Sequence, residues 1–166
     1  MWACEHDGVT PDIITAGKGL ASGLPLSAII ARDTIMDWAP GKHGSTFGGH
    51  PVACAAALAT LDQVEGGLMT NAAQRGEHLI AGLRELAERQ PLITGVRGRG
   101  LMIGFDLPDH DTAVALETAC FERGLLGLTC GKRGFRFAPP LVITDEQADA
   151  ALAIVDDACL AIANRS

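Results

Sequence analysis

Aromatic residues are scarce in this sequence, which has two Trp, five Phe and no Tyr. A protein that binds nucleic acid by stacking bases needs aromatic side chains, so this content weakens that reading. Positive charge is also limited, because 13 Lys and Arg stand against 20 Asp and Glu, for a net charge of −7 at pH 7. DNA and anionic membranes both call for a basic surface. The composition therefore argues against nucleic acid and membranes as partners.

Several motifs that would assign a chemistry directly are absent. The phosphate-binding pattern GxxxxGK[ST], the dinucleotide pattern GxGxxG and the nucleophile elbow GxSxG do not occur in the chain. The five cysteines are scattered and form no CxxC pair, and no His or Cys spacing matches a metal site. This favours a reducing, cytoplasmic setting and no bound metal. The apolar run 52–61 is too short to span a bilayer, and the start MWACEHDGVT does not resemble a signal peptide.

What the sequence does have is enough apolar material for a core, because hydrophobic residues make up 48% of 166 residues. The first half reads as strands, turns and long helices. We expect strands over 12–16 and 24–31, a short helix over 33–38 capped by Asp33, a helix from Pro51 to 64, and helical sequence over 68–89. Gly66 and Gly67 interrupt the helical pattern, which fits two helices or one kinked helix.

The pattern changes after Pro91 to short strands and helices. The stretch VRGRGLMIGFDL reads as a strand pair or one bent strand, and 111–123 as a helix with Asp111 as its cap. Two short strands, LLGLTC and FRFAPPL, flank the turn GKRG. Thr144 and Gln147 have the spacing of a capping box before a final amphipathic helix. This order favours a small α+β domain.

Lys18 is the first candidate for chemistry, because it follows a segment that the sequence predicts as a buried strand and stands between two glycines. A lysine amine becomes a nucleophile when its environment favours the neutral form, as in lysines that form Schiff bases. The alternative is an ordinary solvated loop lysine, which is the commoner state of lysine.

Two further candidates lie in the loop GSTFGGHP and the strand GFRFAPPL. Ser45 and Thr46 offer hydroxyls just before a helix N-terminus, an arrangement that can hold a phosphate. Taken alone, however, the loop is better explained as a flexible turn. Arg136 alternates with Phe135 and Phe137, so it faces away from both. Its guanidinium can take a carboxylate in two parallel hydrogen bonds, or form a surface ion pair.

In combination and order, these motifs resemble one family. PDIITAGKGLASGLPLSAI, HGSTFGGHPVACAAALATLD, VRGRGLMIGFDL and FRFAPPLVITDEQ together resemble the C-terminal part of the class III, pyridoxal-phosphate-dependent aminotransferases, most closely members acting on ω-amino groups and acetylornithine. The resemblance implies an α/β chain, the C-terminal portion of a fold type I transferase. Residues 1–65 would belong to the large cofactor domain, 66–90 to an interdomain helix, and 91–166 to the small α+β domain.

The resemblance also implies roles for the candidate residues. Lys18 would form the Schiff base with pyridoxal 5′-phosphate and then move a proton as base and acid. Thr46, with Ser45 beside it, would reach the cofactor phosphate in the neighbouring subunit of a homodimer. His50 departs from the family, which usually has Asn there. Arg136 would bind the carboxylate of a 2-oxo acid such as 2-oxoglutarate, the acceptor of an amino group from an amine or amino acid.

Family members are longer, and three of their functional parts do not occur in this sequence. These are a phosphate-gripping turn, an aromatic that stacks on the cofactor ring, and an acid that keeps the pyridine nitrogen protonated. We therefore expect a truncated reading frame or a fragment. Two alternatives remain open: a non-catalytic remnant or association module of this fold, and a mutase or decarboxylase that uses the same lysine chemistry.

Overall fold

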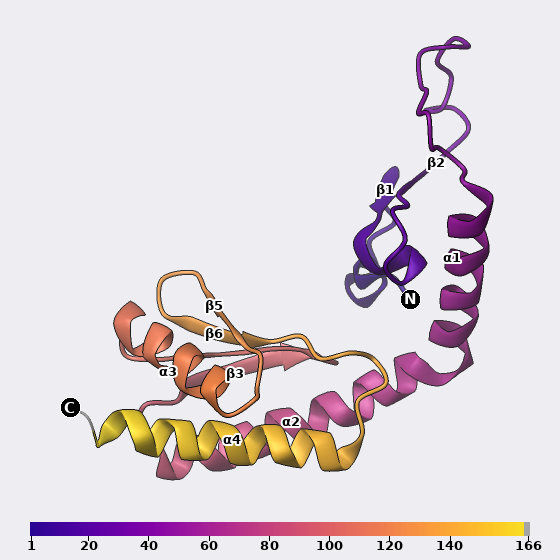
Figure 1. Cartoon of the computed structure of the whole chain (residues 1–166). Helices are drawn as coiled ribbons and strands as arrows, with labels where there is room; N and C mark the ends of the chain where they lie inside the picture. The colour runs from indigo at the N-terminus through magenta and orange to yellow at the C-terminus, as the bar shows by residue number, and fades with distance from the viewer. Residues whose placement is uncertain (165–166) are drawn as a thin grey trace. The chain divides into compact units, whose positions relative to one another are not determined.

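The computed structural model describes residues 1–164, which form two compact units, Met1–Gly67 and the part from Leu68 onward (Figure 1). Unit 1 contains η1 (Ala3–Asp7), β1 (Ile13–Ala16), η2 (Lys18–Ala21), β2 (Ala28–Ala31) and α1 (Pro51–Gln63). Unit 2 contains α2 (Met69–Arg89), β3 (Thr94–Arg99), β4 (Met102–Asp106), α3 (His110–Glu122), β5 (Leu128–Cys130), β6 (Gly134–Phe137) and α4 (Asp145–Ala163). A π-helical turn, η3 (Val64–Leu68), lies between α1 and α2.

Unit 1 is built around an antiparallel strand pair. Ile13 of β1 lies opposite Ala31 of β2, and Ala16 lies opposite Ala28. The β-branched residues of both strands suit this extended pairing. The connection between the strands, residues 17–27, carries the short helix η2 and the candidate lysine.

Helix η2 packs on α1 through small side chains. Ala21 is 1% exposed, and Ala53 and Ala57 are the buried residues of α1. Alanine lets the two backbones approach closely, and the alanine-rich sequence also has high helix propensity. The contact places the turn that begins at Lys18 between strand β1 and helix α1.

The helical sequence in the middle of the chain forms two helices. Gly67 has φ 152° and ψ −17°, outside the helical region, so α1 and α2 are separate elements. Pro51 begins α1, as expected from proline's preference for the first helical turn. The prediction from the Gly66-Gly67 break is thus confirmed in its two-helix form.

Unit 2 contains a four-stranded antiparallel sheet in the order β3-β4-β6-β5. The stretch VRGRGLMIGFDL forms the β3–β4 hairpin, which confirms the strand pair over the single bent strand. Alternate residues of β4 and β6 are buried. Helices α2 and α3 pack against that face of the sheet, and α4 packs on both helices. The opposite face is open, with Met102 63% exposed.

The hydrophobic core of unit 2 lies between the sheet and its helices. Its largest fully buried side chains are Phe105, Phe135, Leu79, Leu83, Ile93, Ile103, Leu107 and Leu116. The rings of Phe105 and Phe135 have centroids 5.4 Å apart and those of Phe135 and Phe137 5.5 Å apart, within the range of favourable aromatic contact. This core fixes the strand that carries Arg136.

Two local predictions were wrong. The segment 33–38 forms a single turn, with Ile35 N donating to Arg32 O, because so short a segment before Pro40 does not repay the cost of helix nucleation. Asp109 caps α3, accepting a hydrogen bond from Thr112 N at 2.7 Å, so the cap is not Asp111.

Among the residues described, no helix is both long and apolar enough to cross a membrane.

Candidate active site

The turn at Lys18 has an unusual backbone. Lys18 (φ 52°) and Ser22 (φ 47°) are the two residues other than glycine with positive φ among those the structure describes. This left-handed conformation costs a residue with a Cβ about 1–2 kcal/mol. Both residues bound the same short helix, because Lys18 begins η2 and Ser22 is its C-terminal cap. Backbone strain in unit 1 is therefore concentrated where the sequence places its candidate amine.

The surroundings of Lys18 are open. The lysine is exposed, and a Cβ built on Gly19 would meet no atom within 4 Å. Gly17 and Gly19 line a cavity of about 250 Å³ in unit 1, together with Trp2 and Thr60. A small molecule thus has access to the amine, with space beside the backbone that carries it.

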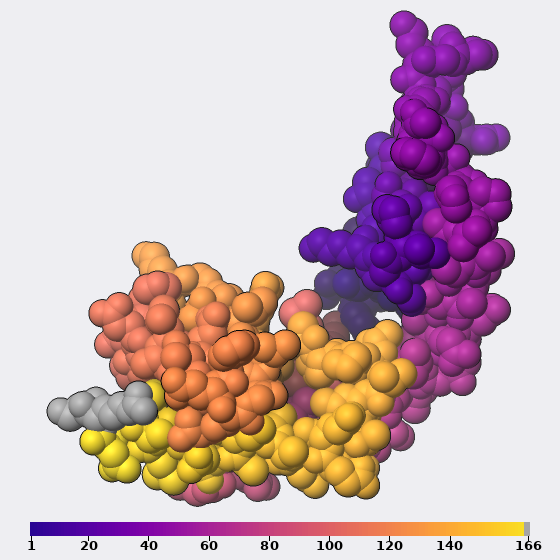
Figure 2. Space-filling model, viewed as in Figure 1, coloured from indigo at the N-terminus to yellow at the C-terminus, as the bar shows by residue number. Residues whose placement is uncertain are grey.

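The loop before α1 presents the predicted hydroxyls to solvent. Ser45 and Thr46 are exposed, and their side chains make no hydrogen bond to other described residues. Phe47, next in sequence, is 76% exposed. Figure 2 shows this connection between β2 and α1 standing out from the rest of unit 1. The loop is available to a group outside its own unit.

The N-terminus of α1 has free hydrogen-bonding capacity. His50 occupies the cap position without a side-chain hydrogen bond, and Pro51 follows as the first helical residue. The uncapped amide groups of the first turn carry positive partial charge, which favours an anion such as phosphate. Ser45 and Thr46 precede this helix end in the chain.

Arg136 lies in the middle of β6 on the open face of the unit 2 sheet. Its neighbours Phe135 and Phe137 are buried in the core while Arg136 is exposed, so the predicted alternation is confirmed. Gly104 lies opposite Arg136 on β4, and Leu128 lies opposite it on β5. Within residues 1–164, Arg136 forms no ion pair. Its guanidinium is free to receive a carboxylate.

Arg97 lies on the same face of the sheet but, unlike Arg136, already has hydrogen-bond partners. Its Nη2 lies 2.9 Å from Asp106 Oδ1, and Nη1 donates to Gly95 O at 2.8 Å. The hydrogen bond that Arg97 donates to the Asp106 carboxylate raises the pKa of Arg97 above its usual value. Arg97 is therefore paired with an acid and is not available for substrate.

Sequence reasoning missed two residues of these sites. Gly104, directly across from Arg136, leaves the approach to the guanidinium uncovered by a side chain. The alternation of MIGFD indicates that Gly104 is on the open face, but its register with Arg136 could not be read from the sequence. Ser22, the cap of the lysine turn, gave no signal, because serine rarely adopts positive φ.

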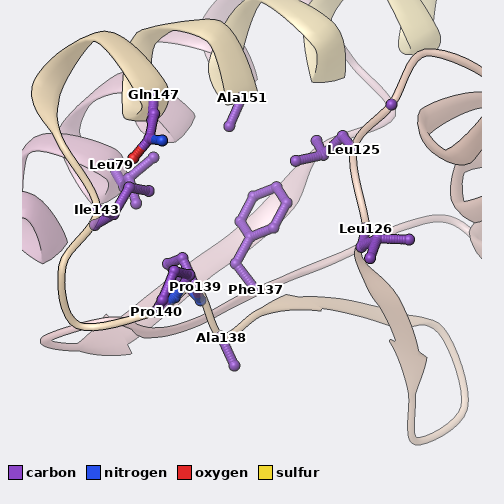
Figure 3. Close-up of a pocket in the computed structure, with 11 residues that line it drawn as sticks. Leu79, Leu125, Leu126, Phe137, Ala138, Pro139, Pro140, Ile143, Gln147 and Ala151 are labelled. Carbon is purple, nitrogen blue, oxygen red and sulfur yellow. The ribbon is translucent and has the colours of Figure 1, made fainter.

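One apolar cavity of unit 2 lies apart from the predicted site residues. It has a volume of about 490 Å³ and lies on the helix side of the sheet, where Phe137, Leu125 and Ile143 face it (Figure 3). None of Lys18, Ser45, Thr46 and Arg136 is among the residues that line it. Of the predicted site residues, the first three lie in unit 1 and Arg136 lies in unit 2.

Comparison with known proteins identifies the class that these features define. Residues 1–159 match the model of the family "Aminotransferase class-III", and the chain belongs to this family. It is 39% identical over 95% of its length to an acetylornithine aminotransferase of Caldanaerobacter subterraneus subsp. tengcongensis, of which it covers 40%. It is 46% identical over 88% of its length to a 4-aminobutyrate aminotransferase of Mycobacterium leprae, of which it covers 35%. The chain thus spans about 40% of the length of such relatives.

A solved structure confirms the predicted fold class. The ornithine aminotransferase of Toxoplasma gondii, crystallized with oxidized glutathione, superposes with a TM-score of 0.88 at 37% identity, covering 98% of this chain and 40% of that one. That structure has partial occupancy of PLP at its active site. The chain is accordingly a C-terminal portion of the fold type I architecture, in a family whose cofactor is pyridoxal 5′-phosphate.

The residues present suit this cofactor. Lys18 supplies an accessible primary amine, and open space adjoins it at Gly19. Ser45 and Thr46 supply hydroxyls before a helix N-terminus that no side chain caps. The reactive aldehyde of the cofactor and its phosphate, which serves for binding, therefore each have residues of matching chemistry in unit 1.

Proposed function

We propose that this chain carries the catalytic lysine and the carboxylate-binding arginine of a transaminase. Its reaction would transfer an amino group from an amine or ω-amino acid to a 2-oxo acid such as 2-oxoglutarate. The observation that best supports this is the left-handed conformation of exposed Lys18. A glycine at position 18 would remove that strain, so a lysine there is explained by its chemistry and not by stability.

Lys18 would both hold the cofactor and move protons. Bound pyridoxal 5′-phosphate supplies an aldehyde for condensation with amines and a conjugated ring that takes up electrons from the substrate carbon. Lys18 Nζ would retain the cofactor before substrate arrives, then accept a proton from the substrate carbon and return it as general acid. Open space beside Gly19, the next residue, would leave room for the cofactor near the backbone of Lys18.

Ser45 and Thr46 would bind the phosphate of the cofactor held by a second copy of the chain in a homodimer. Their exposure and the uncapped N-terminus of α1 support this role. Arg136 would bind a substrate carboxylate through two parallel hydrogen bonds, which its position opposite Gly104 leaves unobstructed. The free state of all five cysteines suits a reducing, cytoplasmic setting.

Reductive trapping tests the role of Lys18. The chain has three lysines, Lys18, Lys42 and Lys132, so the two others are internal references. After incubation with pyridoxal 5′-phosphate and reduction by borohydride, peptide mapping should find the pyridoxyl group on Lys18 in excess of both references. Lys18→Ala should abolish the visible absorbance that arises when the cofactor binds to the protein, and Lys42→Ala should keep it. Equal labelling of the three lysines would refute the assignment.

A product assay then tests the reaction class. Glutamate formed from 2-oxoglutarate, with acetylornithine or 4-aminobutyrate as donor, distinguishes a transaminase from a mutase or decarboxylase. Arg136→Lys should raise the KM for 2-oxoglutarate more than it lowers kcat, because lysine keeps the charge and loses the paired geometry. An unchanged KM would exclude Arg136 as the carboxylate ligand.

A second candidate function is association without catalysis. Unit 1 exposes large apolar side chains on its strands and on α1, including Leu58 at 64% and Ile13 at 52%. Exposed apolar groups of this kind favour binding to another polypeptide. Sedimentation of the chain without cofactor separates the proposals: an assembly that forms without labelling of Lys18 favours association alone.

A further inference from the structure

Two linked hydrogen bonds join the turn at Lys18 to helix α1. The hydroxyl of Thr60 donates to the carbonyl oxygen of Ala56 at 2.8 Å. Thr60 has only one hydroxyl proton, so Ser22 Oγ, 2.8 Å from Thr60 Oγ1, is the donor in the contact between the two hydroxyls. Ser22 and Thr60 are 38 residues apart, so this contact forms only when the turn is docked on the helix.

The turn needs support from outside itself. Within it, Leu20 N donates to Gly17 O and Ser22 N donates to Gly19 O, each at 3.1 Å. These two bonds must hold a strained residue at each end, Lys18 at the start and Ser22 at the cap. Such conformations persist only where surrounding structure imposes them.

Helix α1 supplies a fixed surface for that support. Ala53, Ala57 and Thr60 follow at spacings of four and three, which places them on one face of the helix. The alanines are buried, and buried Ala21 belongs to the turn that packs on this helix. Contacts between methyl groups have little directionality, whereas a hydrogen bond does, so the Ser22–Thr60 contact fixes the orientation of the cap.

We propose that Thr60, acting through Ser22, is a positioning residue that keeps Lys18 in its left-handed conformation. This inference rests on the proposed function of Lys18 as the amine that holds the cofactor. Thr60 has no role in the chemistry itself. It acts on the conformation of the backbone that presents Lys18 Nζ.

Hydrogen exchange of the chain without cofactor tests the first half of the proposal. In Thr60→Val, which keeps the shape of the side chain and removes its hydroxyl, the amides over 17–24 should exchange about fivefold faster, the factor expected for one ordinary hydrogen bond. Thr60→Ser keeps the hydroxyl and should restore the exchange rate of the original chain. Amides of the β1–β2 strand pair in unit 1 should remain protected, which shows that the unit carrying the substitution still folds.

Trapping by pyridoxal 5′-phosphate and borohydride tests the second half. The label on Lys18, relative to Lys42 and Lys132, should fall about fivefold in Thr60→Val and recover in Thr60→Ser. Unchanged exchange over 17–24 would overturn the proposal. So would faster exchange that left the Lys18 label unchanged. Absence of a Lys18 label in the original chain would refute the proposed function, while the exchange data would still decide whether Thr60 holds the turn.

Substitutions of Ser22 provide an independent check should Thr60→Val fail to fold. Ser22→Ala removes the donor and keeps the strain, so it should reproduce the effects of Thr60→Val. Ser22→Gly removes both donor and strain, because glycine accepts positive φ freely. Exchange and labelling should therefore be closer to the original chain in Ser22→Gly than in Ser22→Ala. Equal behaviour of the two variants would show that strain at position 22 has no part in positioning Lys18.

Discussion

Gly76→Ala should destabilise unit 2. Gly76 is a buried residue of α2, and a Cβ there would lie 2.1 Å from the carbonyl oxygen of Gly100, in the turn between β3 and β4. The atom it would meet is backbone, so relief requires the helix and the hairpin to separate. In a close-packed interior such a separation also loosens neighbouring contacts.

The expected change in the free energy of unfolding of Gly76→Ala is the difference between two opposing effects. Replacing glycine by alanine in a helix favours folding by about 0.8–1.0 kcal/mol. Overpacking costs about 1–3 kcal/mol, and contact with backbone places this case at the upper end. The net loss is about 2 kcal/mol, a fall in Tm of roughly 8–16 °C for a unit of about 100 residues.

Gly82→Ala is the matched control, because it lies in the same helix and has the same propensity gain. Its Cβ would meet Leu152 Cδ1 at 2.3 Å, the far end of a flexible side chain. A rotamer adjustment costs about 0.5–1.5 kcal/mol, which the propensity gain nearly cancels. We expect Gly82→Ala to be close to neutral.

In thermal unfolding, two spectroscopic signals report on the two units separately. Both tryptophans, Trp2 and Trp38, lie in unit 1, so their fluorescence reports on that unit alone. Circular dichroism at the helical band is dominated by α2, α3 and α4 of unit 2. Gly76→Ala should lower the midpoint by circular dichroism and leave the fluorescence transition in place. Equal midpoints for the two alanine variants would refute the reasoning from close backbone contact.

Three further predictions concern the core, a helix cap and alkaline pH. Phe105→Ala removes a fully buried ring that contacts Phe135, so denaturant unfolding should show a loss of about 3–5 kcal/mol, and a loss below about 1 kcal/mol would contradict the packing. Thr144→Ala removes the cap of α4 and should cost about 1 kcal/mol, whereas Thr144→Ser should cost little. Burial raises the pKa of the Cys120 thiol to about 11 and that of Cys159 to about 12, from 9.0. The unfolded chain loses these protons first, so stability is full below about pH 9 and falls toward pH 12. Replacing both cysteines by alanine should flatten this fall in alkaline titrations.

Much of the fold could be predicted because local signals agreed with tertiary structure. The capping box at Thr144 and Gln147 forms as the sequence indicates, with Gln147 N donating to Thr144 Oγ1 at 3.3 Å. The alternation around Arg136 correctly placed that side chain on the open face. The cap of α3 was mistaken because Asp109 and Asp111 are equally good caps by type. The backbone conformation that selects Asp109, φ −151° and ψ −179°, is not a property of its sequence neighbours alone.

The lysine turn shows why conformation at the candidate site escaped prediction. Gly17, Gly19 and Gly23 lead one to expect positive φ at glycine. Of the three only Gly23 adopts it, and the neighbouring Lys18 and Ser22 adopt it as well. Their conformations depend on docking against α1, which lies far along the chain, and a local pattern carries no record of such a contact.

Substitutions at this turn are expected to affect stability and the proposed chemistry differently. Strain at Lys18 lowers stability, so replacing it by glycine should stabilise unit 1 while removing the amine. Core substitutions such as Phe105→Ala act in the opposite sense, because they lower stability without touching a proposed site residue. A position where stability and chemistry prefer different residues is best explained by selection for the chemistry, since the folding energy alone would favour glycine. Lys18 is such a position, and its strained backbone therefore supports a functional role independently of the resemblance between sequences.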